Sequence, residues 1–197
     1  MSAIMSTYGR LPVAFASSAG AELFDQKGQA FLDALSGIAV TNLGHCHPNI
    51  TRAITEQAET LLHTSNLYGI SQQERLATEL TQLTGMKKVF FCNSGAEANE
   101  TAIKVARRHG ANQGIKEPKI VVMEGAFHGR TMGALSATGS AAIQEAFKPL
   151  LPGFIRIGRN DIEGLENIAK QHSDVVAIHL EPIQGESGIW PMELEFL

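Results

Sequence analysis

Small residues at one predicted strand–helix junction could bind a phosphate group. The run Asn93–Ala96 follows the short apolar segment Val89–Cys92 and precedes a stretch in which apolar residues recur at helical intervals. The first N–H groups of a helix have no acceptor within the helix, and the helix dipole adds positive potential there, so the junction can attract an anion. Ser94 adds a hydroxyl donor, and Gly95 lets a ligand approach the backbone closely. The alternative is an ordinary strand–turn–helix in which Ser94 only caps the helix.

Two further predicted strand ends carry aromatic and charged residues. Phe127 and Arg130 follow the predicted strand Lys119–Glu124, and Glu186 follows the predicted strand Asp174–Glu181. Phe127 can stack on a flat ring, and Arg130 can clamp a carboxylate or a phosphate with two hydrogen bonds. Ligands of parallel α/β sheets bind outside the carboxyl ends of the strands. We therefore expect all three strand ends to face one site.

Each of these side chains also has a purely structural interpretation. Arg130 could form a salt bridge with one of the 20 acidic residues, and Glu186 could be a solvated acid in a glycine-rich loop. His128 could pack on a bound ring or simply orient its loop. Glu181 ends a buried strand directly before a proline, so its carboxylate is predicted to need a hydrogen-bonding partner.

Composition narrows the class of protein. A net charge of −4 and a pI near 6 argue against nucleic acid or an anionic membrane as the main partner. The apolar runs are shorter than the roughly 20 residues of a membrane span, and the first residues show no signal-peptide pattern. Cys46 and Cys92 cannot form a disulfide framework and are typical of a reducing cytoplasm. His45 and His47 flank Cys46, but no further ligand follows at a spacing suited to zinc.

Hydrophobic spacing predicts the elements that position these residues. A hairpin is predicted from Ala21–Asp25 and Ala30–Ala34, and strand–helix alternation over about 110 residues predicts an α/β fold with a mainly parallel sheet and helices on both faces. Helices are predicted over 49–62, 71–84, 140–148 and 161–171 and after the junction at 93–96, and strands over 89–92, 119–124, 154–157 and 174–181.

Taken together, the motifs resemble the class III aminotransferases, which use pyridoxal phosphate. The resemblance covers nearly the whole chain, and the motifs are specific as a set although none is specific alone. They comprise residues 23–33, 43–48, 93–107, 127–133 and 181–186.

Within this class, two segments are most similar to the acetylornithine aminotransferases of arginine biosynthesis, namely Tyr8–Phe15 and Ser36–His45. Ornithine δ-aminotransferases usually carry a tyrosine where this chain has Ile38, which argues against free ornithine as the substrate. An isoleucine is also compatible with 4-aminobutyrate enzymes. Other amino donors known in the class, succinylornithine and succinyldiaminopimelate, remain alternatives.

The resemblance implies a role for each residue at the three strand ends. Backbone N–H groups of Gly95 and Ala96, assisted by Ser94, bind the cofactor phosphate, and Phe127 stacks on the pyridine ring.

The same resemblance implies how the two substrates bind. Arg130 binds the α-carboxylate of N-acetylornithine. Glu186 is similar to the acid that pairs with a second arginine of the family and releases it when 2-oxoglutarate binds.

The resemblance also implies an organisation. The expected fold is the type I fold of pyridoxal-phosphate transferases, truncated before the sheet and the C-terminal domain are complete. Residues 1–65 are assigned to part of the small domain and a linker, and 66–197 to the N-terminal part of the large cofactor-binding domain. A homodimer with its sites at the subunit interface is implied.

None of the eight lysines is suited to form the Schiff base with the cofactor. We therefore expect this chain to be an N-terminal portion of a cytoplasmic enzyme and to be inactive alone. The alternative from another functional class is a non-catalytic α/β module that binds a phosphorylated ligand.

Overall fold

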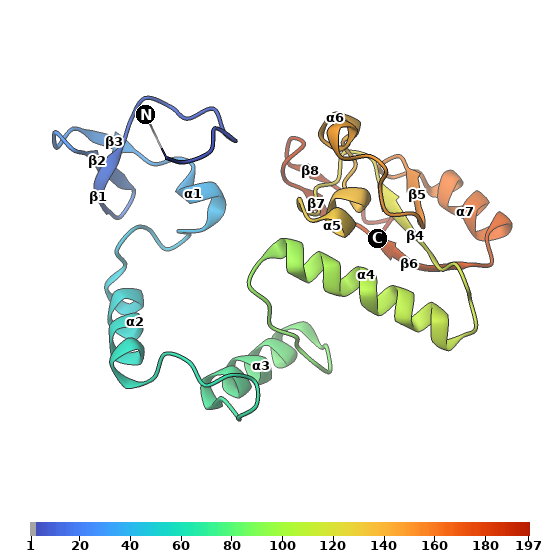
Figure 1. Ribbon diagram of the computed structural model, residues 1–197, viewed down its shortest axis with the longest axis horizontal. Coiled ribbons are helices and arrows are strands. Elements are labelled where there is room, and N and C mark those ends of the chain that lie inside the picture. The colour runs from blue at the N-terminus through green and yellow to red at the C-terminus, as the bar shows by residue number, and fades with distance from the viewer. Residues whose placement is uncertain (1–2) are drawn as a thin grey trace. The chain divides into compact units, whose positions relative to one another are not determined.

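The chain is described by a computed structural model, in which residues 3–197 are placed (Figure 1). It divides into two compact units, an N-terminal unit up to Thr84 and a C-terminal unit, Gly85–Leu197. The predicted domain boundary between residues 65 and 66 stays a prediction.

The N-terminal unit contains a small antiparallel sheet followed by helices. The strands lie in the order β1-β2-β3, and the predicted hairpin is confirmed as β2 and β3. The turn between them is held by Asp25, whose Oδ1 accepts hydrogen bonds from the N–H groups of Lys27 and Gln29, each at 2.8 Å. The elements are β1 (Phe15–Ala19), β2 (Glu22–Asp25), β3 (Ala30–Leu32), α1 (Ser36–Ala39), α2 (Pro48–Thr60) and α3 (Ser71–Thr84).

The C-terminal unit is built around a parallel sheet with the strand order β5-β4-β6. Because β4 pairs in parallel with both neighbours, the three carboxyl ends lie at one edge. A two-stranded antiparallel ribbon, β7 with β8, follows β6. The elements are α4 (Gly95–Asn112), β4 (Lys119–Met123), α5 (Met132–Ala137), α6 (Ala141–Gln144), the 3₁₀ helix η1 (Glu145–Phe147), β5 (Phe154–Ile157), α7 (Ile162–Gln171), β6 (Val175–His179), β7 (Ile183–Gln184) and β8 (Trp190–Pro191).

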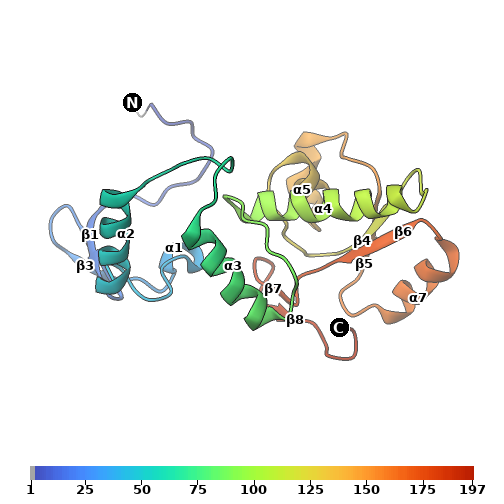
Figure 2. The same cartoon turned by 90° about the horizontal axis from the view of Figure 1, so that it is seen from below.

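Helices cover both faces of this sheet, as predicted (Figure 2). Side chains alternate between the faces of a strand, so β4 supplies two apolar layers. Val121 and Met123 lie in the layer that Leu165 and Ile168 of α7 pack against. Val122 and Ile120 lie in the other layer, with Ile103 and Ala106 of α4. The central strand is thus the most buried part of the unit.

Two of the predicted strands differ in the structure. The prediction of a strand over Val89–Cys92 is wrong: these residues form no strand, and Phe90 is 70% exposed. A strand needs a partner for its N–H and C=O groups, and no other segment within 3–197 pairs with this one. The strand predicted as buried over 174–181 is β6, but it is only half-buried and Ile178 is 47% exposed, because β6 lies at the edge of the sheet.

A buried polar group lies behind the carboxyl edge of the sheet. His128 is 3% exposed, and its backbone N–H donates to Oγ1 of Thr138 at 3.0 Å. Its ring packs on the ring of His179, with 4.2 Å between the centroids. Burial lowers the pKa of His128 to about 4, because the apolar surroundings disfavour the imidazolium.

Gly110→Ala is expected to destabilise the protein, although alanine is the better helix former. A Cβ at Gly110 would lie 2.7 Å from Cβ of Pro118 and 2.8 Å from Cγ1 of Val176. Both contacts are too short, so α4 would have to move away from the sheet or these neighbours would have to shift. The propensity gain is about 1 kcal/mol, whereas overpacking costs about 1–3 kcal/mol. Urea unfolding measures the difference. Gly95→Ala in the same helix is the control, because a Cβ there meets nothing within 4 Å. Equal stability of both variants would contradict the close packing.

The stability of the protein is expected to fall as the pH drops from about 6.5 to about 4. In this range the unfolded chain protonates His128, with its ordinary pKa of 6.5, while the folded protein keeps it neutral down to about 4. The loss is up to about 3 kcal/mol, and the lowered pKa of His179 adds to it in the same direction. Urea midpoints measured across this pH range for His128→Gln should show a shallower decline. The control is His63→Gln at an exposed site, which keeps the wild-type slope; an unchanged slope in His128→Gln would refute the assignment.

Candidate active site

The start of α4 offers free backbone donors. Ser94 has an extended conformation and caps the helix: its Oγ accepts a hydrogen bond from the N–H of Glu97 at 3.2 Å, and the carboxylate of Glu97 accepts one from the N–H of Asn93 at 2.6 Å. The Ser94 cap makes the helix begin at Gly95, and Glu97 holds the residue before the cap. Within residues 3–197 the N–H groups of Gly95 and Ala96 have no acceptor. The hydroxyl hydrogen of Ser94 also remains available.

The loop that follows β4 lies directly against this helix start. Gly129 has a φ of 129°, and a Cβ there would lie 2.8 Å from Cβ of Ala96. Nδ2 of Asn99 donates to the carbonyl oxygen of His128 at 2.7 Å. The loop between Phe127 and Arg130 is therefore held next to Ser94–Ala96, as predicted.

The loop that follows β6 joins the same edge. The N–H of Phe127 donates to Oε1 of Glu181 at 2.7 Å, and the N–H of Gly185 donates to Oε2 at 3.4 Å. The prediction that Glu181 needs a hydrogen-bonding partner is confirmed. The buried side chain of Gln184 donates to the carbonyl oxygen of Glu124 at 2.8 Å. The loops that follow β4 and β6 thus meet the start of α4 at one edge of the sheet, as expected, although the described residues directly before α4 form no strand.

Two charged side chains at this edge have no partner of opposite charge. Arg130 is exposed, its Cζ lies 5.6 Å from the centroid of the half-buried Phe127 ring, and it forms no ion pair with any residue that the structure describes. Glu186 is also exposed and forms no hydrogen bond or ion pair within the described part of the chain. The structural salt bridge considered for Arg130 is therefore not formed among these residues. Both charges can meet a ligand.

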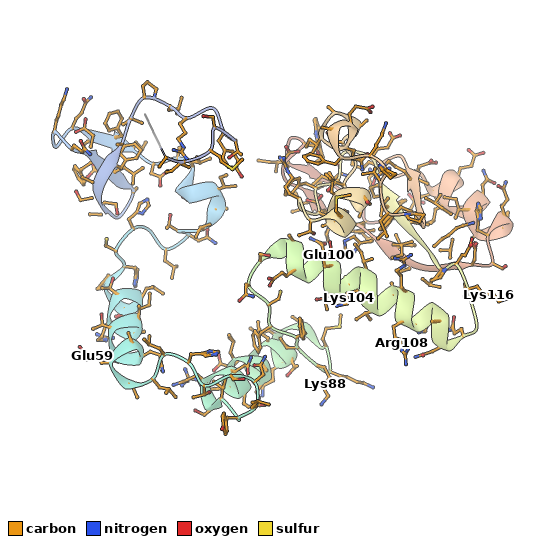
Figure 3. The ribbon with its side chains drawn as sticks, in the orientation of Figure 1. Glu59, Lys88, Glu100, Lys104, Arg108 and Lys116 are labelled. Carbon is orange, nitrogen blue, oxygen red and sulfur yellow. The ribbon has the colours of Figure 1, made fainter. Side chains whose placement is uncertain are left out.

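Two residues of α4 that sequence reasoning did not single out tie the site together. Asn99 contacts the Phe127 loop, as described above. Glu100 accepts hydrogen bonds through Oε1 from Oγ1 of Thr131 at 2.5 Å and from the N–H of Ala134 at 3.1 Å, which anchors the start of α5 to α4 (Figure 3). Helical spacing placed both among the polar residues of the helix, and no pattern in the sequence distinguishes a polar residue that faces a loop from one that faces solvent.

The histidines of the N-terminal unit do not form a metal cluster. Nε2 of His45 lies 2.6 Å from Oδ2 of Asp33, which lowers the pKa of the aspartate. Among residues 3–197 no group of three or more His, Cys, Asp or Glu side chains is placed to hold a metal ion. Nor is any helix of this part of the chain long and apolar enough to cross a membrane.

Residues 4–197 match the family described as aminotransferase class-III. The chain is 56% identical over 189 residues to the acetylornithine aminotransferase of Nitrosomonas europaea, which covers 96% of the chain and 48% of that protein. The chain thus spans about half the length of the curated relatives it matches.

Two solved structures show the same relationship. The chain is 38% identical, with a TM-score of 0.79, to the N-acetylornithine aminotransferase of Stenotrophomonas maltophilia; the match covers 96% of the chain and 46% of that structure. It is 30% identical, with a TM-score of 0.90, to the ornithine aminotransferase of Toxoplasma gondii, which has partial occupancy of pyridoxal phosphate at its active site; here the match covers 98% and 46%. The predicted α/β fold of the pyridoxal-phosphate transferases is confirmed. The chain belongs to the class III aminotransferase family, whose enzymes depend on pyridoxal phosphate.

Proposed function

We propose that this chain is part of an enzyme that transfers the δ-amino group of N-acetylornithine to 2-oxoglutarate, a step of arginine biosynthesis. The observation that carries the proposal is the 56% identity to a protein named acetylornithine aminotransferase. Among the solved structures, the chain is 38% identical to an N-acetylornithine aminotransferase and 30% identical to an ornithine aminotransferase. Ile38, in place of the tyrosine usual in ornithine enzymes, supports the same choice.

The residues at the carboxyl edge fit pyridoxal phosphate. The unpaired N–H groups of Gly95 and Ala96 and the hydroxyl of Ser94 suit a phosphate at the start of α4. Phe127, half-buried on the adjacent loop, suits the flat ring. When bound, the cofactor supplies the electron sink that transamination requires.

Arg130 and Glu186 are proposed to determine how the two substrates bind. The guanidinium of Arg130 lies next to the Phe127 ring, so a carboxylate that it binds would be held beside the cofactor site. Glu186 is free to pair with an arginine from another part of the protein and to exchange it when a dicarboxylate binds. This exchange would let one site accept both N-acetylornithine and 2-oxoglutarate.

Residues 1–197 are proposed not to catalyse transamination by themselves. Nζ of Lys119 forms an ion pair with Asp174 at 2.8 Å, beside the amino ends of β4 and β6, far along the strands from the site. Two other lysines pair with glutamates on their own helical turns, and Lys104 and Lys116 lie along α4 and the turn after it (Figure 3). The lysine that bonds to the cofactor is therefore proposed to come from outside these residues.

A cytoplasmic homodimer is the proposed form of the enzyme. Both cysteines are free and exposed, in keeping with a reducing compartment. In the C-terminal unit Val105 is 63% exposed and Ile178 is 47% exposed, and apolar side chains of this kind commonly contact further protein surface.

The protein made from the complete reading frame is expected to turn over N-acetylornithine with a higher kcat/KM than ornithine, 4-aminobutyrate, succinylornithine or succinyldiaminopimelate. Arg130→Gln should lower kcat/KM for N-acetylornithine by about 10- to 100-fold, mainly through KM, because a charged hydrogen bond to the carboxylate is lost. Arg108→Gln, on the exposed side of α4, is the matched control and should leave it unchanged. Preference for another of these amines would replace the proposed substrate within the same family.

Residues 1–197 alone are expected to bind pyridoxal phosphate reversibly, without the absorbance change that a covalent bond to a lysine produces, and to show no transamination. Titration of the chain with the cofactor, followed by gel filtration and by borohydride reduction, tests this. Covalent labelling of a lysine after reduction, together with turnover, would refute the proposal and identify the lysine.

A further inference from the structure

We propose that Asn99 is a positioning residue that holds the phosphate-binding start of α4 against the Phe127 loop and the end of β6. This inference rests on the proposed function, because it assigns a role toward the same cofactor. Asn99 lies in the second turn of α4, one turn beyond Gly95.

The side chain of Asn99 makes three hydrogen bonds to three different elements. Nδ2 donates to the carbonyl oxygen of Gly95 at 2.9 Å and to that of His128 at 2.7 Å. Oδ1 lies 2.7 Å from Nε2 of His179, the last residue of β6. An amide has two donor hydrogens and an acceptor oxygen, so this set of partners uses its complete donor capacity.

The three partners fix the chemistry of the position. Two carbonyl oxygens require a donor, and this places the amide oxygen of Asn99 toward His179. His179 must therefore carry its hydrogen on Nε2, which makes it the donor in this contact. The lowered pKa of His179, caused by burial, keeps the ring in the neutral form. An aspartate at position 99 would keep the acceptor but would turn an oxygen toward the two carbonyl groups.

Two of the three contacts of Asn99 are made to residues at or next to the proposed cofactor site. Gly95 presents its N–H to the phosphate, and Asn99 holds the carbonyl of the same residue. His128 directly follows Phe127, the residue proposed to stack on the ring. Within residues 3–197, the bond from Asn99 to His128 is the one hydrogen bond between α4 and the loop 127–130. Loss of the amide would free the phosphate and ring contacts to shift relative to each other.

Four quantities measured on the protein from the complete reading frame test the proposal for Asn99→Ala and Asn99→Asp. They are the dissociation constant for pyridoxal phosphate added to the apoprotein, the visible circular dichroism of the bound cofactor, kcat and the urea midpoint. We expect cofactor binding to weaken by roughly tenfold or more, the dichroism to change, and kcat to fall by on the order of 100-fold at saturating cofactor, as for a misplacement of about 1 Å.

Thr101→Ala is the matched control. Oγ1 of Thr101 donates only to the carbonyl oxygen of Glu97 in the same helix, at 2.9 Å, so its loss removes a helix contact without touching the loop. It should keep the wild-type affinity and dichroism. If Asn99→Ala does not fold, Asn99→Asp, which keeps the shape and the acceptor, provides the measurement.

The outcomes separate this inference from the proposed function. Wild-type affinity, dichroism and kcat in Asn99→Asp would overturn the positioning role, whatever happens to its stability, while leaving the aminotransferase in place. A wild-type protein that binds no pyridoxal phosphate would overturn both. A change in cofactor affinity and dichroism in the Asn99 variants, absent from Thr101→Ala, supports the proposal.

Discussion

The parallel pairing of β4 with both of its neighbours is the constraint on which the candidate site depends. Parallel strands end at the same edge, so the loops that leave β4 and β6 start beside each other. Burial of the central strand, in which Val121, Val122 and Met123 are fully inaccessible, fixes the register of that pairing. Apolar packing in the middle of the unit therefore determines where the polar groups at its edge can meet.

Hydrogen bonds from buried or half-buried side chains then hold the loops at this edge of the sheet in place. Glu181 joins the loop after β6 to the loop after β4, Asn99 joins α4 to the loop after β4 and to the last residue of β6, and Gln184 bonds to the residue after β4. Except for the contact between the side chains of Asn99 and His179, these bonds join side chains to backbone atoms, and they hold in place loops that have no regular structure of their own. Side chains that could bind a ligand, such as Arg130, are left outside this network. The residues that hold the loops in place are therefore different from the residues that face outward and could bind a ligand.

Much of this arrangement could be predicted from the sequence, because periodicity and turn residues are local signals. The helices α2, α3 and α7, the strand β4 and the convergence of the loops after β4 and β6 on the start of α4 followed from spacing and from the geometry of parallel sheets. The strand predicted over Val89–Cys92 does not form, because apolar composition does not indicate whether another segment is available to pair with it. The contacts of Asn99 and Glu100 with the loop after β4 and with α5 could not be predicted either, because the partner residues lie about 30 residues or more away in the chain. Long-range partners of polar residues are decided by the fold and leave no pattern at either end.

The side-chain cap at the start of α4 has a consequence for the order in which folding and binding occur. Ser94 accepts a hydrogen bond from the N–H of Glu97, and Glu97 accepts one from the N–H of Asn93, so the helix does not need a bound anion in order to begin at Gly95. The donor groups are thus oriented before any ligand arrives. Binding of an anion at the start of α4 therefore costs little backbone conformational entropy, and the first helical turn is the same with and without the ligand.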